Sequence, residues 1–149
     1  MLKEVGKRGS QLLLIALASY LAAWLYIIAL WFDRLRFLRD LQILVAAGFL
    51  ALWFLFPFRH RLGFRTGLAA GLIAAVPSIA FTLVHASLER RGISTDGSLF
   101  GVLHPGTTPL IYFYHAFQTW GIDIQTIPYL TPPLTILLAG LGGALGRRR

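Results

Sequence analysis

Long runs of apolar residues, separated by short polar segments, dominate the sequence. The first run covers residues 11–32 and has no charged side chain in its 22 positions. As a helix rising about 1.5 Å per residue it would reach about 33 Å, enough to cross a hydrocarbon core about 30 Å thick. Comparable runs follow at 41–58, 66–88 and 127–146. The pattern predicts an all-α integral membrane protein with four transmembrane helices, organised as a single polytopic domain over residues 1–149.

Proline and turn-forming residues shape the second half of the chain. Pro77 lies in the middle of the third run, where it removes a backbone donor and predicts a kinked helix. Residues 89–126 are rich in turn-forming residues, which predicts an outer loop. Within this loop, residues 109–120 are apolar and aromatic, but as a helix they would reach only about 18 Å. We therefore expect a short outer helix that either lies at the membrane interface or re-enters the membrane.

The ends of the second and fourth runs carry further signals. Aromatic residues gather at the inner end of the second run, as in the belts that anchor helices at a membrane interface. They are Trp53, Phe54, Phe56 and Phe58. Pro128, Pro132 and Pro133 fall in the first turns of the fourth run, which predicts a weak helix there. Residues 33–40 are too few to fold alone, so the first two runs are expected to form an antiparallel hairpin.

The chain begins with basic residues, as a signal peptide would. Lys3, Lys7 and Arg8 precede the first run, which continues well past the small residues Ala16 and Ala18 that could imitate a cleavage site. The length of the run predicts an uncleaved signal anchor.

Small residues recur at helical spacing in the third and fourth runs. In lipid, such faces allow two helix backbones to approach closely. We expect them to pack helices together, either within the chain, third helix against fourth, or between copies in an oligomer. The predicted packing residues are Gly63, Gly67, Gly71, Ala139, Gly143 and Gly146.

Polar residues continue the glycine face of the third run toward its outer end. Because polar groups inside a membrane are costly, they mark candidate functional sites. One hypothesis is a ligand-binding site formed with the outer aromatic segment. Its residues would be Ser78, Thr82, His85, Tyr112, His115 and Trp120. The alternative is structural: the hydroxyl groups bond back to helix carbonyls, and Glu89 pairs with a nearby arginine.

Basic residues lie in short clusters beside the apolar runs. The formal net charge is +8, with 14 lysine and arginine residues. With four spans, nine of them flank one side of the membrane and five the other. The positive-inside rule then places both termini in the cytoplasm, and we expect a prokaryotic cytoplasmic membrane. The expected partner is the lipid bilayer, not nucleic acid. The terminal residues 147–149 either bind anionic headgroups or serve only as a topological flank.

Residue patterns of common catalytic and metal sites are missing from the sequence. It has no cysteine, which excludes disulfides, thiolate catalysis and cysteine-ligated metals. The spacing of His60, His85, His104 and His115 matches no short ligand motif. No GxSxG elbow, P-loop or Rossmann fingerprint occurs. We therefore expect no metal, no cofactor and no catalytic residue.

Three functions remain open, in this order. The first is a non-catalytic structural or accessory subunit of a membrane assembly, which packs through glycine-rich helix faces as a homo-oligomer or with partner subunits. The second is a small transporter or ligand-binding protein with its site between the third helix, the outer aromatic segment and the fourth helix. The third is a membrane enzyme at the outer interface, with His104 or His115 as general base.

Overall fold

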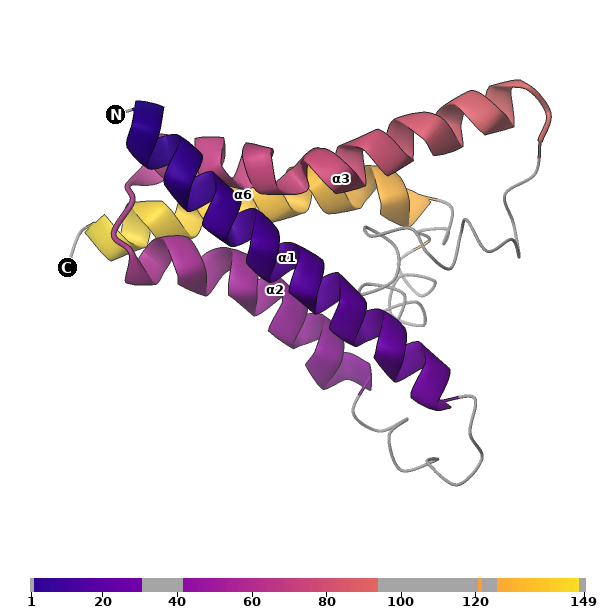
Figure 1. The fold of residues 1–149 in the computed structure, drawn as a ribbon, viewed down its shortest axis with the longest axis horizontal. Coiled ribbons are helices and arrows are strands. Elements are labelled where there is room, and N and C mark those ends of the chain that lie inside the picture. The colour runs from indigo at the N-terminus through magenta and orange to yellow at the C-terminus, as the bar shows by residue number, and fades with distance from the viewer. Residues whose placement is uncertain (1, 31–41, 94–120, 122–125, 148–149) are drawn as a thin grey trace.

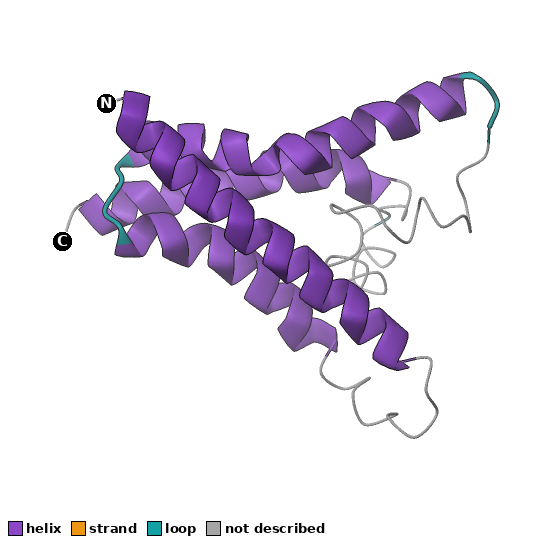
Figure 2. Ribbon diagram, in the orientation of Figure 1, coloured by secondary structure: helices purple, strands orange, loops and turns teal. Residues whose placement is uncertain are grey.

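All regular structure in the described part of the chain is helical (Figure 2). The computed structural model describes residues 2–30, 42–93, 121 and 126–147. Its long helices are α1 (Leu2–Leu30), α2 (Gln42–Arg59), α3 (Phe64–Arg90) and α6 (Ile127–Arg147). The predicted all-α class is consistent with this architecture.

Three of the helices are long and apolar enough to cross a membrane. These stretches are Lys3–Tyr26, Phe64–Arg90 and Tyr129–Arg147. The apolar part of α2, Ile43–Arg59, is shorter than the others. The helices thus suggest a membrane location, with three spans clear by length and composition and the fourth expected span resting on a shorter helix.

The four helices meet at one end of the molecule and separate toward the other (Figure 1). The first turns of α1, the turn between α2 and α3, and the last turn of α6 lie together, and we call this the terminal end. Away from it, α1 stays beside α2 and α3 stays beside α6, while the two pairs diverge. We call the opposite end, where α3 ends and α6 begins, the distal end. The chain directions of α1 and α2 are those of an antiparallel hairpin.

Helix bounds follow the apolar runs closely, except at the start of α1. That helix begins at Leu2, nine positions before the predicted run, so Lys3, Lys7 and Arg8 are helical. A helix does not have to end where its apolar face ends, because charged residues in water also favour helix. The first turns of α6 are helical, and the helix is continuous through Pro132 and Pro133; that these turns are weak stays a prediction. In its first turns the Thr131 hydroxyl donates to the Ile127 carbonyl oxygen at 2.8 Å, a local bond of the kind threonine makes within a helix.

Two expected features of the second half stay predictions. α3 passes through Pro77 as one helix, and a kink there is not established. The expected short outer helix over 109–120 lies outside the described residues, as does most of the loop 89–126. The described start of that loop is a glycine cap: Gly92 has a φ of 72°, and the amides of Gly92 and Ile93 donate to the carbonyl oxygens of Glu89 and Leu88. This is the Schellman arrangement, and it ends α3.

The buried core gathers around small and aromatic side chains. Its members are Leu12, Ala16, Tyr20, Phe49, Trp53, Ala74, Ala75, Ile127 and Ala139. Trp53 is 1% exposed and its ring meets Phe49 edge-on at 6.2 Å between centroids. The expectation that Trp53 belongs to an interfacial belt is therefore wrong, because its side chain is covered inside the bundle.

Close backbone packing of α6 against α3 occurs at the small residues. A Cβ atom built on Gly67 would meet the carbonyl oxygen of Ala139, and one built on Gly71 would lie 2.8 Å from the Ala139 Cβ. Farther toward the terminal end, the Gly63 amide donates to the Gly143 carbonyl oxygen at 3.1 Å. Gly63 has a φ of 79° at the N-cap of α3, a conformation that glycine adopts readily and other residues rarely do.

A second small face of α6 packs against α2. Cβ atoms added to Gly142 and Gly146 would meet the carbonyl oxygens of Phe54 and Phe58. α6 thus lies against two neighbours at once. Its Ala139 and Gly143 contact α3 and the turn before it, and its Gly142 and Gly146 contact α2. In the described chain, the small-residue faces are filled by intrachain contacts.

Replacing Gly67 by alanine tests this packing. The added methyl group would overlap the Ala139 carbonyl oxygen, so we expect the free energy of unfolding to fall by about 1–3 kcal/mol. Gly48→Ala is the matched control, because Gly48 lies in α2 with nothing within 4 Å of its added Cβ. There, alanine should leave stability unchanged or raise it by up to about 1 kcal/mol. Unfolding in detergent, followed by tryptophan fluorescence, measures both; equal stabilities would contradict the packing.

Candidate functional site

A polar cluster joins α3 and α6 near the distal end. His85 and Glu89 are one helical turn apart on α3, and the His85 Nε2 lies 3.1 Å from the Glu89 Oε1. From α6, the Tyr129 hydroxyl donates to the Glu89 Oε2, also at 3.1 Å. The His85 and Tyr129 rings are tilted, with 6.0 Å between their centroids. We call these three side chains the His85–Glu89–Tyr129 cluster.

The cluster is buried at one side and open at the other. His85 is only 6% exposed, whereas the Glu89 side chain is 38% exposed and Tyr129 is 41% exposed. A carboxylate in this position accepts hydrogen bonds from the phenol and forms an ion pair with the imidazole when the latter is protonated. The cluster can therefore hold a proton or bind a polar group that approaches Glu89 from outside the bundle.

Between the cluster and the terminal end, some hydroxyl groups of α3 and α6 are hydrogen-bonded and one is not. The Thr82 hydroxyl donates to the Ser78 carbonyl oxygen at 2.8 Å, and the Thr135 hydroxyl on α6 donates to the Thr131 carbonyl oxygen at 2.9 Å. These are the local bonds expected of threonine in a membrane helix. Ser78 differs, because it is 1% exposed and its Oγ has no hydrogen-bond partner in the part of the chain that the structure describes.

A second buried hydroxyl without a partner among the described residues lies in the core on α1. Tyr20 is 8% exposed, its ring packs on Phe49 with 5.4 Å between centroids, and its hydroxyl oxygen makes no hydrogen bond within that part of the chain. A buried polar group left in this state costs about 1–3 kcal/mol. The Tyr20 and Ser78 hydroxyls are thus two positions in the core where a polar atom of a water or a ligand would lower the free energy.

Three of the predicted ligand-site residues lie on one face of α3. Ser78, Thr82 and His85 follow one another at steps of four and three, toward the distal end. The other three, Tyr112, His115 and Trp120, lie outside the described residues, so the predicted site stays a hypothesis. The predicted packing residues lie where α6 meets its neighbours: Gly63, Gly67, Gly71, Ala139 and Gly143 at the α3 contact, and Gly146 at the α2 contact.

Sequence reasoning missed one participant of the cluster, Tyr129. The spacing of four between His85 and Glu89 puts both on one helix face, and the sequence left open whether Glu89 lines a site with His85 or pairs with a nearby arginine. In the structure the carboxylate contacts His85 and Tyr129. Tyr129 carried no comparable signal, since its role depends on where α6 begins beside α3.

Metal binding has little support in the described residues. Across residues 2–30, 42–93 and 126–147, no group of three or more histidine, aspartate, glutamate or cysteine side chains is placed to hold a metal ion. The His85–Glu89 pair offers two such ligands, and zinc sites in proteins ordinarily use three or four. The chemistry that the cluster supports is therefore hydrogen bonding and proton exchange.

Known proteins were compared with the chain by sequence and by fold. No family, no curated protein and no solved structure matches it.

Proposed function

We propose that the chain is a non-catalytic integral membrane protein with a structural or accessory role in a membrane assembly. The observation that carries this proposal is the contact of the α6 backbone with both α2 and α3, at Gly142, Gly143 and Gly146. Backbone contact of this kind holds helices at fixed separation and register, because any side chain larger than hydrogen would force them apart. A rigid bundle is what a scaffold requires, and it needs no catalytic group.

Partner contacts in such an assembly would use the outward faces of the helices. The small-residue faces are occupied within the chain, so they are not left for another subunit in the described bundle. Large apolar side chains remain exposed on α3 and α6. They include Leu72, Val76, Leu83, Leu137, Leu141 and Leu145. These side chains face either lipid or a neighbouring subunit.

The proposal includes an orientation in the membrane. The N-terminal end of α1 and the C-terminal end of α6 lie at the same end of the bundle (Figure 1), and the larger share of basic flanking residues belongs to that side. By the positive-inside rule, this end would face the cytoplasm. A prokaryotic cytoplasmic membrane fits this proposal.

Native mass spectrometry after gentle detergent extraction tests the assembly role. We expect the 16.6 kDa chain in a discrete complex, either with other subunits or with further copies of itself. Two results together would contradict the proposal. The chain would be extracted as a monomer at several detergent concentrations, and crosslinking in intact membranes would join it to no protein partner. Crosslinkers at the exposed Leu83 and at the buried Ala74 form a matched pair. Only the exposed position should reach a partner.

A second function is favoured by a separate observation. The buried Ser78 hydroxyl without a partner, on the same helix face as His85, would suit a small transporter or ligand-binding protein with a site on α3. Under this alternative, a bound ligand supplies the missing hydrogen bond. The enzyme hypothesis uses His104 or His115, which lie outside the described residues, and it gains no support from the described geometry.

Variants of Ser78 and His85 separate the two functions. If the role is structural, Ser78→Ala should leave stability unchanged or raise it slightly, because it removes an unpartnered buried hydroxyl. His85→Ala should then lower the free energy of unfolding by about 1–3 kcal/mol, since it empties a buried position and removes the contact with Glu89.

Ligand retention is measured on the same preparations. Loss of a stoichiometric small molecule from Ser78→Ala, with stability unchanged, would favour ligand binding over the structural role. Thr135→Val serves as the control, because the Thr135 hydroxyl is already satisfied by carbonyl oxygens of its own helix.

A further inference from the structure

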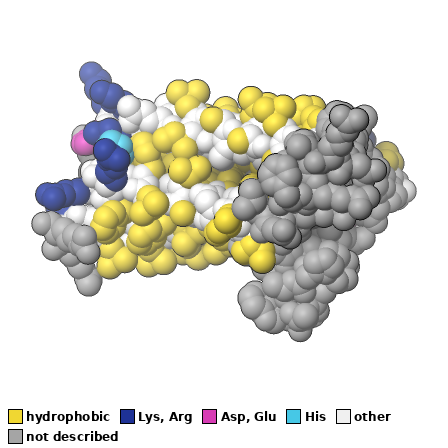
Figure 3. Space-filling view, turned by 90° about the horizontal axis from the view of Figure 1, so that it is seen from below, with side chains coloured by type: hydrophobic (Ala, Val, Ile, Leu, Met, Phe, Trp, Pro, Cys, Tyr) yellow, Lys and Arg dark blue, Asp and Glu magenta, His cyan; other side chains and the backbone are white. Residues whose placement is uncertain are grey.

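The His85–Glu89–Tyr129 cluster lies where the apolar surface of α3 and α6 ends. Figure 3 shows a belt of hydrophobic side chains beside the basic terminal end. α3 runs from that end as an apolar helix, and its apolar run stops at Leu88, immediately before Glu89. Tyr129 begins the apolar stretch of α6, and tyrosine at such a boundary is typical of headgroup depth. The cluster is therefore level with the lipid headgroups of the leaflet at the distal end.

The cluster presents hydrogen-bond acceptors to the outside of the bundle. Its carboxylate has one oxygen 3.1 Å from the His85 Nε2, and the other accepts from the Tyr129 hydroxyl at 3.1 Å. Each carboxylate oxygen has two lone pairs, and so has the phenol oxygen that donates its proton to Glu89. Glu89 and Tyr129 are both exposed, so these acceptors can be reached from outside. Such a surface suits a cation that carries several N–H donors.

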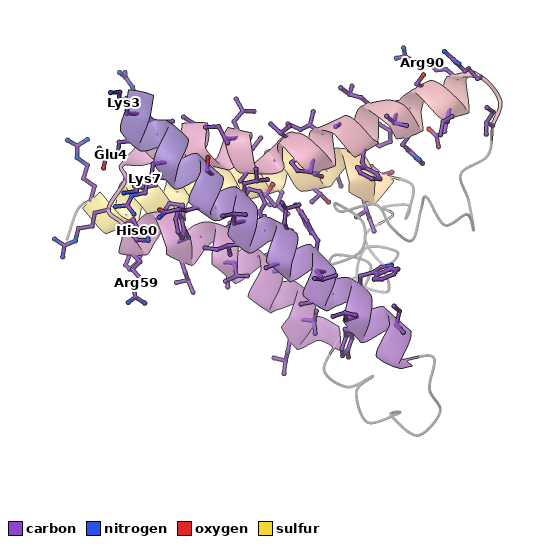
Figure 4. All side chains as sticks on the ribbon, viewed as in Figure 1. Lys3, Glu4, Lys7, Arg59, His60 and Arg90 are labelled. Carbon is purple, nitrogen blue, oxygen red and sulfur yellow. The ribbon has the colours of Figure 1, made fainter. Side chains whose placement is uncertain are left out.

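A positive side chain stands directly beside this carboxylate. Arg90 follows Glu89 at the end of α3, is exposed, and is labelled at the distal end in Figure 4. The Cα atoms of consecutive residues are about 3.8 Å apart, so the two opposite charges lie within the reach of one small molecule. A guanidinium group binds phosphate oxygens through charge-assisted hydrogen bonds. The pair therefore complements a zwitterion that has an ammonium group and a phosphate.

An apolar seam leads from the cluster along the contact of α3 with α6. One end of the seam is the Tyr129–Glu89 hydrogen bond. At the other end, a Cβ atom built on Gly140 would lie 2.6 Å from the Leu68 Cδ2. Between these two contacts, residues at steps of three and four line the seam, and each is half-buried or exposed. They are Ile79, Thr82 and Ala86 on α3, and Pro133 and Leu137 on α6. Four of these five side chains are apolar, so the seam suits an acyl chain.

We propose that the cluster binds the headgroup of phosphatidylethanolamine, with one acyl chain of the lipid along the α3–α6 seam. The primary ammonium group donates hydrogen bonds to the Glu89 carboxylate and the Tyr129 oxygen, and the phosphate lies at Arg90. A choline headgroup carries the same charge but has no N–H donor, so hydrogen bonding distinguishes the two lipids. The proposal rests on the membrane location of the helices and not on the assembly role, because a monomeric chain has the same seam.

The lipid preference of the purified chain tests the proposal. The delipidated protein is titrated with phosphatidylethanolamine, its N,N-dimethyl derivative and phosphatidylcholine, all with the same acyl chains, and bound lipids are counted by native mass spectrometry. We expect retention to fall in that order, because the number of N–H donors falls while the charge stays the same. Equal retention of the three lipids would overturn the proposal.

The variant Glu89→Gln removes the charge and keeps the shape of the side chain. Its amide oxygen still accepts a hydrogen bond from Tyr129, so the contact between α3 and α6 is kept. We expect phosphatidylethanolamine to bind about tenfold or more weakly, because a hydrogen bond to a charged group is lost, and the preference over phosphatidylcholine to disappear. An unchanged preference in this variant would contradict the proposal.

The matched control removes the same charge from the opposite end. Glu4 is exposed on α1, and Figure 4 labels it at the terminal end. Glu4→Gln should bind phosphatidylethanolamine as the unmodified chain does. Equal losses in the two variants would show that only net charge matters, and would overturn the site. Full displacement of the lipid by glycerophosphoethanolamine would also overturn it, since a free headgroup gains nothing from the seam.

A measurement on the unmodified chain does not depend on the folding of any variant. A phosphatidylethanolamine with a photoreactive group in its acyl chain, close to the glycerol, is activated in a reconstituted bilayer. It should label α3 around Thr82 and Ala86, and α6 around Pro133 and Leu137. Labelling spread evenly over the exposed leucines of α1 and α2, such as Leu21 and Leu44, would contradict the proposal.

Discussion

The approach of the α6 backbone to its two neighbours is the constraint on which the rest of the structure depends. Apolar side chains gain little by leaving lipid for one another, so helices in a membrane associate through close packing and polar contacts. In this chain Gly142 and Gly146 bring α6 against α2, and Gly67 and Gly71 bring α3 against α6. The Gly63 amide then bonds across to Gly143. Because all these contacts involve backbone atoms, each leaves almost no room for a side chain.

The sequence predicted best the features that depend on one helix alone, such as where that helix begins and ends. The ends of α2 and α6 lie within one or two residues of the apolar runs, since apolar length governs a spanning helix. The start of α1 was missed, because residues outside the apolar run also form helix. Glycine spacing indicated close packing, yet it did not reveal that α6 presents two faces to two helices. Trp53 and Tyr129 show the same limit: burial of the first and the contact of the second with Glu89 arise only from tertiary structure.

The hydroxyl groups inside the bundle differ in whether they are hydrogen-bonded. The hydroxyls of Thr82, Thr131 and Thr135 donate to carbonyl oxygens of their own helices, so these residues can lie inside the bundle without an unsatisfied donor. Ser78 and Tyr20 do not, so two buried hydroxyls lack a partner among the described residues. Because an unsatisfied buried hydroxyl costs about 1–3 kcal/mol, these two groups are the reason to keep ligand binding as a second function beside the scaffold.

The same packing constraint also explains why the two ends of the bundle have different chemistry. Where the glycine contacts draw the helices together, the ends of α1, α2, α3 and α6 lie close to one another, so their basic residues share one small surface (Figure 4). Where the helix pairs diverge, the described carboxylate Glu89 contacts His85 and Tyr129. Positive potential at the terminal end therefore follows from backbone geometry as much as from composition.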